Sequence, residues 1–309
     1  MSFAFFFPGQ GSQSLHMMDG FADKALVKET FDEASAVLNL DLWQMINGDD
    51  EGVIGQTVNT QPIMLAAGIA VYRVYLAEGG RIPAAVAGHS LGEYSALVAA
   101  EALGFEDAVR LVRLRAGLMQ DAVPEGVGAM AAILGLEDGR VKDICAAAAQ
   151  GGVVEAVNFN SPGQVVIAGH AAAVERAMAA AKEAGAKRAL PLPVSVPSHC
   201  SLMKPAAEKL ASALAEVDFA VPKIRVIHNA DVASYDDAAD IRDALVRQLY
   251  SPVRWTETVN LLVDGGIRDS AECGPGRVLA GLAKRINKDA VCAALTGSGQ
   301  VEAFIKDFS

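Results

Sequence analysis

The sequence predicts an α/β fold in which a mainly parallel sheet, covered by helices, carries an inserted subdomain. Short apolar runs alternate with longer helical patterns up to residue 124 and again after residue 197, and this alternation is typical of a parallel sheet. Between these parts the expected order of elements is βαββαβ, which is the order of a ferredoxin-like unit. We therefore expect an α/β core of residues 1–124 and 197–309 and an inserted ferredoxin-like subdomain of residues 125–196.

The expected elements follow from the apolar pattern in chain order. The first part contains strands at 3–7 and 84–87 and helices at 62–78, from Leu91 onward, and at 106–122. The insert contains strands at 129–134, 153–158, 165–168 and 187–196 and helices at 138–150 and 171–184. The last part contains helices at 204–217, 239–250 and 255–263 and strands at 224–228, 268–272 and 291–295. We expect a binding site in the crevice between the two units.

Composition narrows the class of protein. Of the 309 residues 52% are hydrophobic and 20% are charged, the balance of a globular protein. The longest uncharged apolar stretch, Ile63 to Tyr72, is short of the roughly 20 residues that span a bilayer, and the apolar residues 3–7 lack the preceding basic segment of a secretory signal. We expect no membrane association.

Charge and cysteine usage give two further expectations. The formal net charge of −11 argues against nucleic acid as a partner. The four cysteines lie far apart without a CxxC pair, which favours a reducing, cytoplasmic location over a disulfide framework. Any anionic ligand must then be bound by a local basic spot.

Residues 88–92, Gly-His-Ser-Leu-Gly, match the nucleophile elbow G-x-S-x-G between an apolar strand and an amphipathic helix. The glycines remove side chains that would collide on a sharp turn. Ser90 then lies at a helix N-terminus, where the N–H of Leu91 is the natural first donor to an oxyanion. The alternative is that Ser90 only caps the helix.

A serine nucleophile needs a base within hydrogen-bond reach. The five histidines are His16, His89, His170, His199 and His228. His89 is adjacent to Ser90 and should point away from it, His170 opens a helix of the insert, and His228 ends a strand. His199 lies where the chain returns from the insert, beside the crevice, and is our candidate for the general base. No acid that would orient its ring is evident, and a backbone carbonyl could do so instead.

Arg115 falls in the apolar row of its helix, with Ala108, Leu111, Leu118 and Ala122. A buried guanidinium needs a partner, and its planar fork suits a carboxylate. The functional interpretation is that Arg115 binds an anionic substrate. A structural ion pair, or a packed stem with an exposed head group, remains an alternative.

Together these motifs resemble those of the malonyl-CoA:acyl carrier protein transacylases. The matching segments cover nearly the whole chain: 8–13 (PGQGSQ), 88–94 (GHSLGEY), 113–120 (RLRAGLMQ), 158–164 (NFNSPGQ), 196–200 (VPSHC) and 248–255 (QLYSPVRW). The resemblance implies a hydrolase-like core with a ferredoxin-like insert. Ser198 is small, where many malonyl-selective relatives carry phenylalanine, so exclusion of branched substrates stays open.

The resemblance also implies a role for each matched residue. Ser90 is the nucleophile, His199 the base, and the N–H groups of Gln10 and Leu91 form the oxyanion hole. Arg115 holds the malonyl carboxylate, and a main-chain carbonyl near Gln248 orients the histidine.

The implied reaction is ping-pong transfer of malonyl from malonyl-CoA, through an ester on Ser90, to the pantetheine thiol of acyl carrier protein, for fatty acid synthesis. The resemblance does not distinguish fatty acid synthesis from polyketide synthesis. No metal or redox cofactor is required, and we expect a monomer. A serine hydrolase and a non-catalytic carrier-binding subunit remain rivals.

The carrier is acidic, so we expect a basic rim near the crevice, with Lys187, Arg188 and Lys204 as candidates. These residues are equally consistent with ordinary solvated surface charge.

Overall fold

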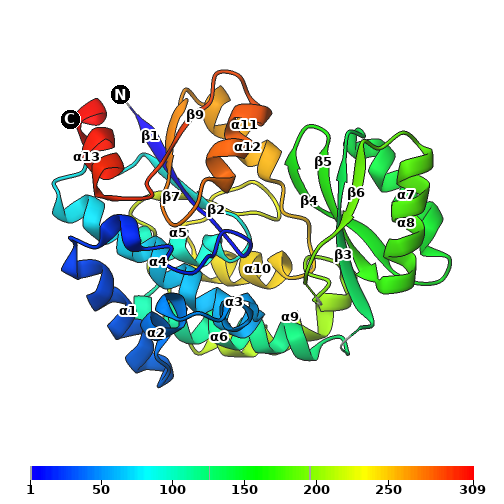
Figure 1. The fold of residues 1–309 in the computed structure, drawn as a ribbon, viewed down its shortest axis with the longest axis horizontal. Helices are drawn as coiled ribbons and strands as arrows, with labels where there is room; N and C mark the ends of the chain where they lie inside the picture. The colour runs from blue at the N-terminus through cyan, green and yellow to red at the C-terminus, as the bar shows by residue number, and fades with distance from the viewer. Residues whose placement is uncertain (1, 125, 195) are drawn as a thin grey trace.

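The computed structural model describes residues 2–124, 126–194 and 196–309, which form two sheets with helices around them (Figure 1). The first is a parallel five-stranded sheet in the order β7-β2-β1-β8-β9. Its strands are β1 (Phe3–Phe7), β2 (Ala85–Gly88), β7 (Arg225–Ile227), β8 (Asp269–Glu272) and β9 (Val291–Ala294). The predicted α/β class with a mainly parallel sheet is confirmed.

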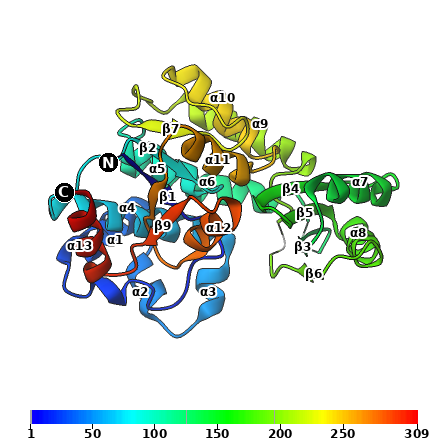
Figure 2. The ribbon, with the colours of Figure 1, turned by 90° about the horizontal axis from the view of Figure 1, so that it is seen from above.

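The second sheet is antiparallel and has the order β4-β5-β3-β6. Its strands are β3 (Gly128–Leu134), β4 (Val154–Ser161), β5 (Gln164–His170) and β6 (Arg188–Pro191). With α7 (Asp138–Ala149) and α8 (Ala171–Glu183) they follow the order βαββαβ of a ferredoxin-like unit. This unit lies to one side of the rest of the molecule in both views (Figures 1 and 2). The predicted boundary at residue 125 lies outside the described residues.

The remaining helices belong to the part built on the parallel sheet. They are α1 (Ala25–Leu38), α2 (Leu42–Asn47), α3 (Glu51–Gly55), α4 (Thr57–Ala77), α5 (Gly92–Ala99), α6 (Phe105–Asp121), α9 (Lys204–Ala215), α10 (Ala238–Gln248), α11 (Trp255–Asp264), α12 (Val278–Ile286) and α13 (Ser298–Phe308). Among the described residues, no helix has the length and apolar character needed to cross a membrane.

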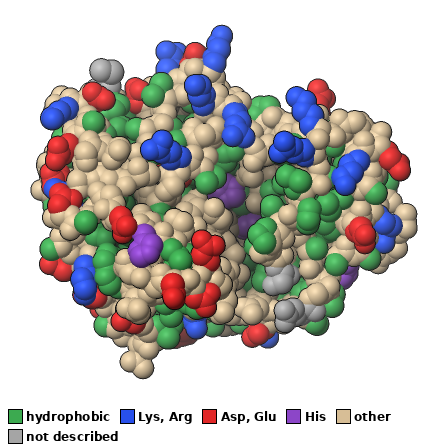
Figure 3. All heavy atoms as spheres, in the orientation of Figure 1, with side chains coloured by type: hydrophobic (Ala, Val, Ile, Leu, Met, Phe, Trp, Pro, Cys, Tyr) green, Lys and Arg blue, Asp and Glu red, His purple; other side chains and the backbone are tan. Residues whose placement is uncertain are grey.

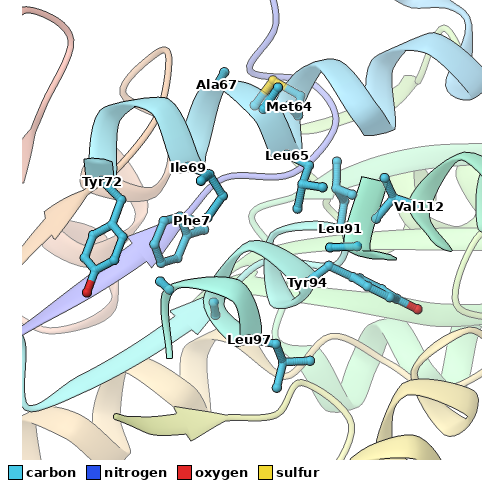
Figure 4. Packing of buried hydrophobic residues seen from close by; sticks show 14 of the residues in the cluster. Phe7, Met64, Leu65, Ala67, Ile69, Tyr72, Leu91, Tyr94, Leu97 and Val112 are labelled. Carbon is cyan, nitrogen blue, oxygen red and sulfur yellow. The ribbon is translucent and has the colours of Figure 1, made fainter. Parts of the chain in front are cut away.

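Strand β1 lies at the centre of the parallel sheet and is buried on both faces. Phe3, Phe5 and Phe7 pack into the large cluster formed with α4, α5 and α6, whereas Ala4 and Phe6 pack on the opposite face with Trp255 and residues of α11 and α12. Successive side chains of a strand point to opposite faces, so one short apolar run holds both layers. Figure 4 shows the first layer, with Phe7 lying between side chains of α4 and α5.

Helix α4 begins five residues earlier than the predicted start at Pro62, which lies inside it. A proline has no N–H to donate to the carbonyl four residues before it. That carbonyl belongs to Val58 and accepts a hydrogen bond from Nη1 of Arg113. A side chain distant in sequence thus replaces the missing helix bond, which the local pattern could not indicate.

Two other expected elements differ from the structure. Helix α5 was expected to be amphipathic, but seven of its eight residues are buried, so it is an interior helix. Strand β6 ends at Pro191, earlier than the predicted residue 196. Pro193 follows two residues later and cannot donate to a strand ladder, which limits the pairing. Residue 195, within the predicted strand, lies outside the described residues.

Candidate active site

The chain turns sharply at Ser90 between β2 and α5, and Ser90 has φ of +53°, a left-handed backbone conformation. The turn brings backbones into close approach. A Cβ atom at Gly88 would lie 1.8 Å from the carbonyl carbon of Gly92, and one at Gly92 would lie 2.0 Å from the carbonyl oxygen of Phe7. Only glycine fits at both positions, so the sequence motif produces the elbow geometry for a steric reason.

The loop after β1 packs directly against this turn. A Cβ atom at Gly9 would lie 2.5 Å from the carbonyl oxygen of His89, so glycine is required there as well. The close approach brings the next residue, Gln10, to the pocket that Ser90 and Leu91 also line.

Ser90 and His199, 109 residues apart, are in hydrogen-bond contact: Oγ of Ser90 lies 2.7 Å from Nε2 of His199. The other ring nitrogen, Nδ1, lies 2.8 Å from the main-chain oxygen of Gln248. A carbonyl only accepts, so Nδ1 carries the proton and Nε2 is free to accept from the serine hydroxyl. Burial, and next the positive charge of Arg115, lower the pKa of His199 to about 3. The ring is therefore neutral near pH 7, as a base must be.

Arg115 on α6 is 1% exposed, and its guanidinium reaches the same point. Nη2 donates to Oγ of Ser90 at 3.2 Å and to Oε1 of Gln248 at 3.0 Å, and Nη1 donates to Oε1 of Gln61 at 2.9 Å. Among the described residues its hydrogen-bond partners are all neutral oxygens, and its Nε has none. The alternatives of a structural ion pair and of an exposed head group are therefore wrong.

Of the other histidines, His89 also lines the pocket in front of Ser90, but its ring, like those of His170 and His228, makes a different contact. Nε2 of His89 lies 2.8 Å from Oδ1 of Asn160 on β4, a contact between the core and the inserted unit. Nδ1 of His170 accepts from the N–H of Val153 at 2.9 Å. His228 is buried, with its Nδ1 2.7 Å from Oε1 of Glu93. None of these three hydrogen bonds reaches Ser90.

Two side chains that hold the elbow were not anticipated. Asn229 accepts from the N–H of Ser90 and donates to the carbonyl of Gly88, both at 2.7 Å. Glu93 in turn accepts from the N–H of Asn229 at 3.0 Å and from Nε2 of Gln248 at 2.9 Å. Asparagine after a strand and glutamate in the first turn of a helix are common, so neither gave a specific sequence signal. Only Glu93, as part of the GHSLGEY match, was named at all.

The pocket in front of Ser90 is a cavity of about 120 Å³, large enough for a small acyl group. It lies where the two units meet, and Figure 3 shows a hollow there with histidine side chains inside it. Its lining residues are Gln10, Thr57, Gln61, His89, Ser90, Leu91, Arg115, Met119, Met130, Asn158, Leu192, Val194, Val196, Ser198 and His199. Among the described residues, no group of three or more histidine, cysteine or acidic side chains is placed to hold a metal ion.

The candidate basic residues for a carrier rim are not in this lining. Lys187, Arg188 and Lys204 are all exposed. Lys187 and Arg188 lie at the start of β6, and the chain that follows β6 contributes Leu192 and Val194 to the pocket. Nζ of Lys204 lies 5.9 Å from the ring centroid of Tyr250.

Comparison with known proteins gives consistent matches over nearly the whole chain. The acyl transferase domain family matches residues 4–299. The malonyl CoA-acyl carrier protein transacylase of Salmonella typhimurium is 55% identical over 97% of this chain and 98% of its own length, and that of Bacillus subtilis is 45% identical over 98% and 96%.

Solved structures are equally similar. An acyl carrier protein S-malonyltransferase from Vibrio cholerae superimposes with a TM-score of 0.96 at 55% identity, covering 98% of this chain and 100% of that one. A malonyl-transacylase in complex with a type II PKS acyl-carrier protein gives a TM-score of 0.98 at 52% identity, over 99% and 100%.

Proposed function

This chain belongs to the acyl transferase domain family, and from that premise we propose that it transfers a malonyl group from malonyl-CoA to acyl carrier protein through an ester on Ser90. Relatives with that activity in their names match it at 55% identity over nearly its full length. The observation that carries the proposal is the position of one oxygen atom. Oγ of Ser90 lies 2.7 Å from a neutral imidazole and 3.2 Å from a guanidinium that hydrogen-bonds to no carboxylate in the part of the chain that the structure describes.

In the first half-reaction Nε2 of His199 takes the proton from Oγ of Ser90, and the oxygen attacks the thioester carbon of malonyl-CoA. The negative oxygen that forms is stabilised by the N–H groups of Gln10 and Leu91, the latter at the N-terminal end of α5. The C–S bond then breaks, and the proton on His199 passes to the sulfur of CoA. This leaves the malonyl ester on Ser90.

In the second half-reaction the pantetheine thiol of the carrier gives its proton to His199, and its sulfur attacks the ester carbon. The bond to Oγ breaks, and the proton returns to Ser90. The main-chain oxygen of Gln248 holds Nδ1–H of the ring throughout, so an acidic third residue is not needed. This chemistry uses side chains and backbone alone and requires no metal or redox cofactor.

Arg115 gives the reaction its preference for an acyl group with a carboxylate. Its guanidinium is buried beside the nucleophile, and its hydrogen-bond partners within residues 2–124, 126–194 and 196–309 are neutral oxygens. A planar fork of donors binds a carboxylate through two hydrogen bonds. The distal carboxylate of a malonyl group on Ser90 therefore completes the charge pairing that the protein itself leaves open.

The test is the intact mass of the protein after incubation with malonyl-CoA and no acceptor. We expect a malonyl-sized adduct that maps to Ser90, persists for minutes, and disappears when acyl carrier protein is added. The Ser90→Ala variant should form no adduct and should lose at least about 10⁴-fold in turnover.

Two other outcomes would favour the rival functions. Rapid loss of the adduct without acceptor would indicate a hydrolase. Carrier binding with no adduct at all would indicate a non-catalytic subunit.

We also propose that the protein works as a monomer in the cytoplasm, with acyl carrier protein of fatty acid synthesis as its partner. One chain supplies the hydroxyl, the imidazole and the guanidinium of the site, which supports a monomer. The four cysteines carry free thiols, which fits a reducing compartment. A structural relative is in complex with its acyl-carrier protein, which supports the partner.

A further inference from the structure

Glu93 is a fully buried carboxylate that the mechanism above does not use. It lies one turn after Ser90 on α5 and is 0% exposed. Oε1 contacts Nδ1 of His228 at 2.7 Å, and Oε2 accepts from the N–H of Asn229 at 3.0 Å and from Nε2 of Gln248 at 2.9 Å. A buried carboxylate is costly without such partners, so its position is fixed by three separate contacts.

The side chain of Gln248 connects this carboxylate to Arg115. Its Oε1 accepts from Nη2 of Arg115 at 3.0 Å, and its Nε2 donates to Glu93 and, at 2.9 Å, to the main-chain oxygen of Ser90. An amide has one accepting end and one donating end. Because Glu93 can only accept, it forces the donating end toward itself and the accepting end toward the guanidinium.

This orientation places the amide oxygen of Gln248, a neutral acceptor, against the Arg115 guanidinium. A negatively charged carboxylate in the place of the Gln248 amide would form a direct, buried ion pair with Arg115 and compete with an incoming carboxylate. The amide oxygen holds Nη2 without a formal charge, as Gln61 holds Nη1. Burial lowers the pKa of the Arg115 guanidinium, and Tyr94 and, to a smaller extent, the nearby negative charge of Glu93 oppose that effect. The charge of Glu93 thus offsets part of the cost of burying the Arg115 guanidinium. The neutral amide of Gln248 lies between the two charged groups.

We propose that Glu93 is a positioning residue for carboxylate recognition: through the side-chain amide of Gln248 it holds Arg115 beside Ser90 while leaving the guanidinium open to the carboxylate of the substrate. This role rests on the proposed malonyl transfer. It concerns the side chain of Gln248, which is separate from the main-chain carbonyl that binds His199.

The test compares the rate of Ser90 acylation by malonyl-CoA with that by acetyl-CoA, which has no distal carboxylate, in the wild type and in Glu93→Gln. The glutamine keeps the shape, and its oxygen can still accept from Asn229 and Gln248, but the charge that fixes the amide is gone. We expect the malonyl-to-acetyl ratio of kcat/KM to fall about tenfold, the size expected when a charged hydrogen bond becomes neutral. The fall should appear mainly as a higher malonyl-CoA concentration for half-maximal acylation.

The matched control is His228→Asn, which keeps an N–H donor for Oε1 of Glu93 but removes the ring. It should lower the thermal unfolding midpoint and leave the malonyl-to-acetyl ratio unchanged. If Glu93 were only a structural partner, Glu93→Gln and the control would behave alike, and both acylation rates would fall in the same proportion.

A second variant, Gln248→Met, removes the side-chain amide that links Glu93 to Arg115 and keeps the main-chain carbonyl that binds His199. It also provides a test if Glu93→Gln does not fold. Gln248→Met should lower the malonyl-to-acetyl ratio at least as much as Glu93→Gln does. The double variant should have the same ratio as Gln248→Met, because two changes in one connection are not additive. An unchanged ratio in either single variant, a lower malonyl KM in Glu93→Gln, or multiplied effects in the double variant would overturn the inference. These results would leave the proposed function standing, because that function fails if the wild type forms no malonyl adduct or loses the adduct rapidly without an acceptor.

Discussion

The parallel-sheet core and the inserted antiparallel unit both contribute to the pocket, but they contribute different things. The core provides the polar atoms, including Oγ of Ser90, the imidazole of His199 and the guanidinium of Arg115. The inserted unit and the chain that follows β6 provide mainly apolar wall, with Met130, Leu192 and Val194. The reacting groups are therefore placed by one unit, while the other encloses them.

Backbone geometry supports the same division. Ser90 and His199 both have positive φ, +53° and +66°, which side-chain-bearing residues adopt at a cost of about 1–3 kcal/mol each. Such conformations persist only where surrounding contacts fix them. In the core those contacts are the buried amides and carboxylate around Ser90, and the N–H of His199 donates to the carbonyl of Leu249 at 3.0 Å.

Among the variants that leave the nucleophile in place, the largest effect is expected from removing the cation of the core, Arg115. Arg115→Ala leaves the malonyl carboxylate without a partner in a buried pocket, which costs about 3–5 kcal/mol, or roughly 10²- to 10⁴-fold in kcat/KM for malonyl-CoA. Acetyl-CoA does not use this contact and should lose much less. Steady-state rates with both substrates measure the difference, and an equal loss for both would contradict selective carboxylate binding.

The next largest effect is expected from a variant that weakens the hydrogen bonds of the elbow at Ser90 but does not alter a contact to the substrate. Asn229→Ala removes partners from the N–H of Ser90 and the carbonyl of Gly88, and two unsatisfied buried groups cost about 2–4 kcal/mol of stability. We expect a lower thermal unfolding midpoint and slower acylation by malonyl-CoA and acetyl-CoA in equal proportion. A normal midpoint with altered selectivity would assign Asn229 to the substrate instead.

How far the sequence could predict the structure depends on whether a signal is local. The elbow at Ser90 was predicted because its glycines, strand and helix are contiguous. Leu91 follows from the position of the elbow at a helix N-terminus and His199 from considering five histidines, whereas Gln10 and Gln248 come from resemblance to a family. Helices α1, α2, α3, α12 and α13 were not predicted. No capping side chain marks the start of α1, α12 or α13, whereas α2 and α3 are capped by Asp41 and Asp50 but have only six and five residues.

The interior polar contacts could not be predicted at all. Asn229 contacts Ser90 over 139 residues, and Glu93 contacts Gln248 over 155. A hydrogen bond of this kind depends on how the core helices and strands pack, and neither residue type is unusual where it stands. The same holds for Arg113, which replaces the helix bond that Pro62 removes.

A smaller effect is expected on the surface of the inserted unit. Arg188→Glu reverses an exposed charge at the start of β6, and an exposed ion pair contributes about 0.2–1 kcal/mol, so the KM for acyl carrier protein should rise about two- to fivefold. The KM for malonyl-CoA should not change. Arg225→Glu, at the exposed edge of the parallel sheet, is the matched control. Equal effects on carrier and CoA substrate would exclude Arg188 from a docking rim.

The smallest expected effect is that of pH on the rate of acylation. It tests whether the imidazole of His199 is buried in the core. The pKa of His199 is about 3 instead of 6.5, so the base stays neutral and the rate of Ser90 acylation should be flat between about pH 8 and pH 5. An unfolded histidine takes up a proton below about pH 6.5 and the folded one does not, so this residue makes the protein less stable as pH falls from 6.5 toward 3. His199→Ala should weaken that dependence. An acylation rate that falls with a midpoint near 6.5 would mean that the imidazole is solvated, and that the core does not shield its base.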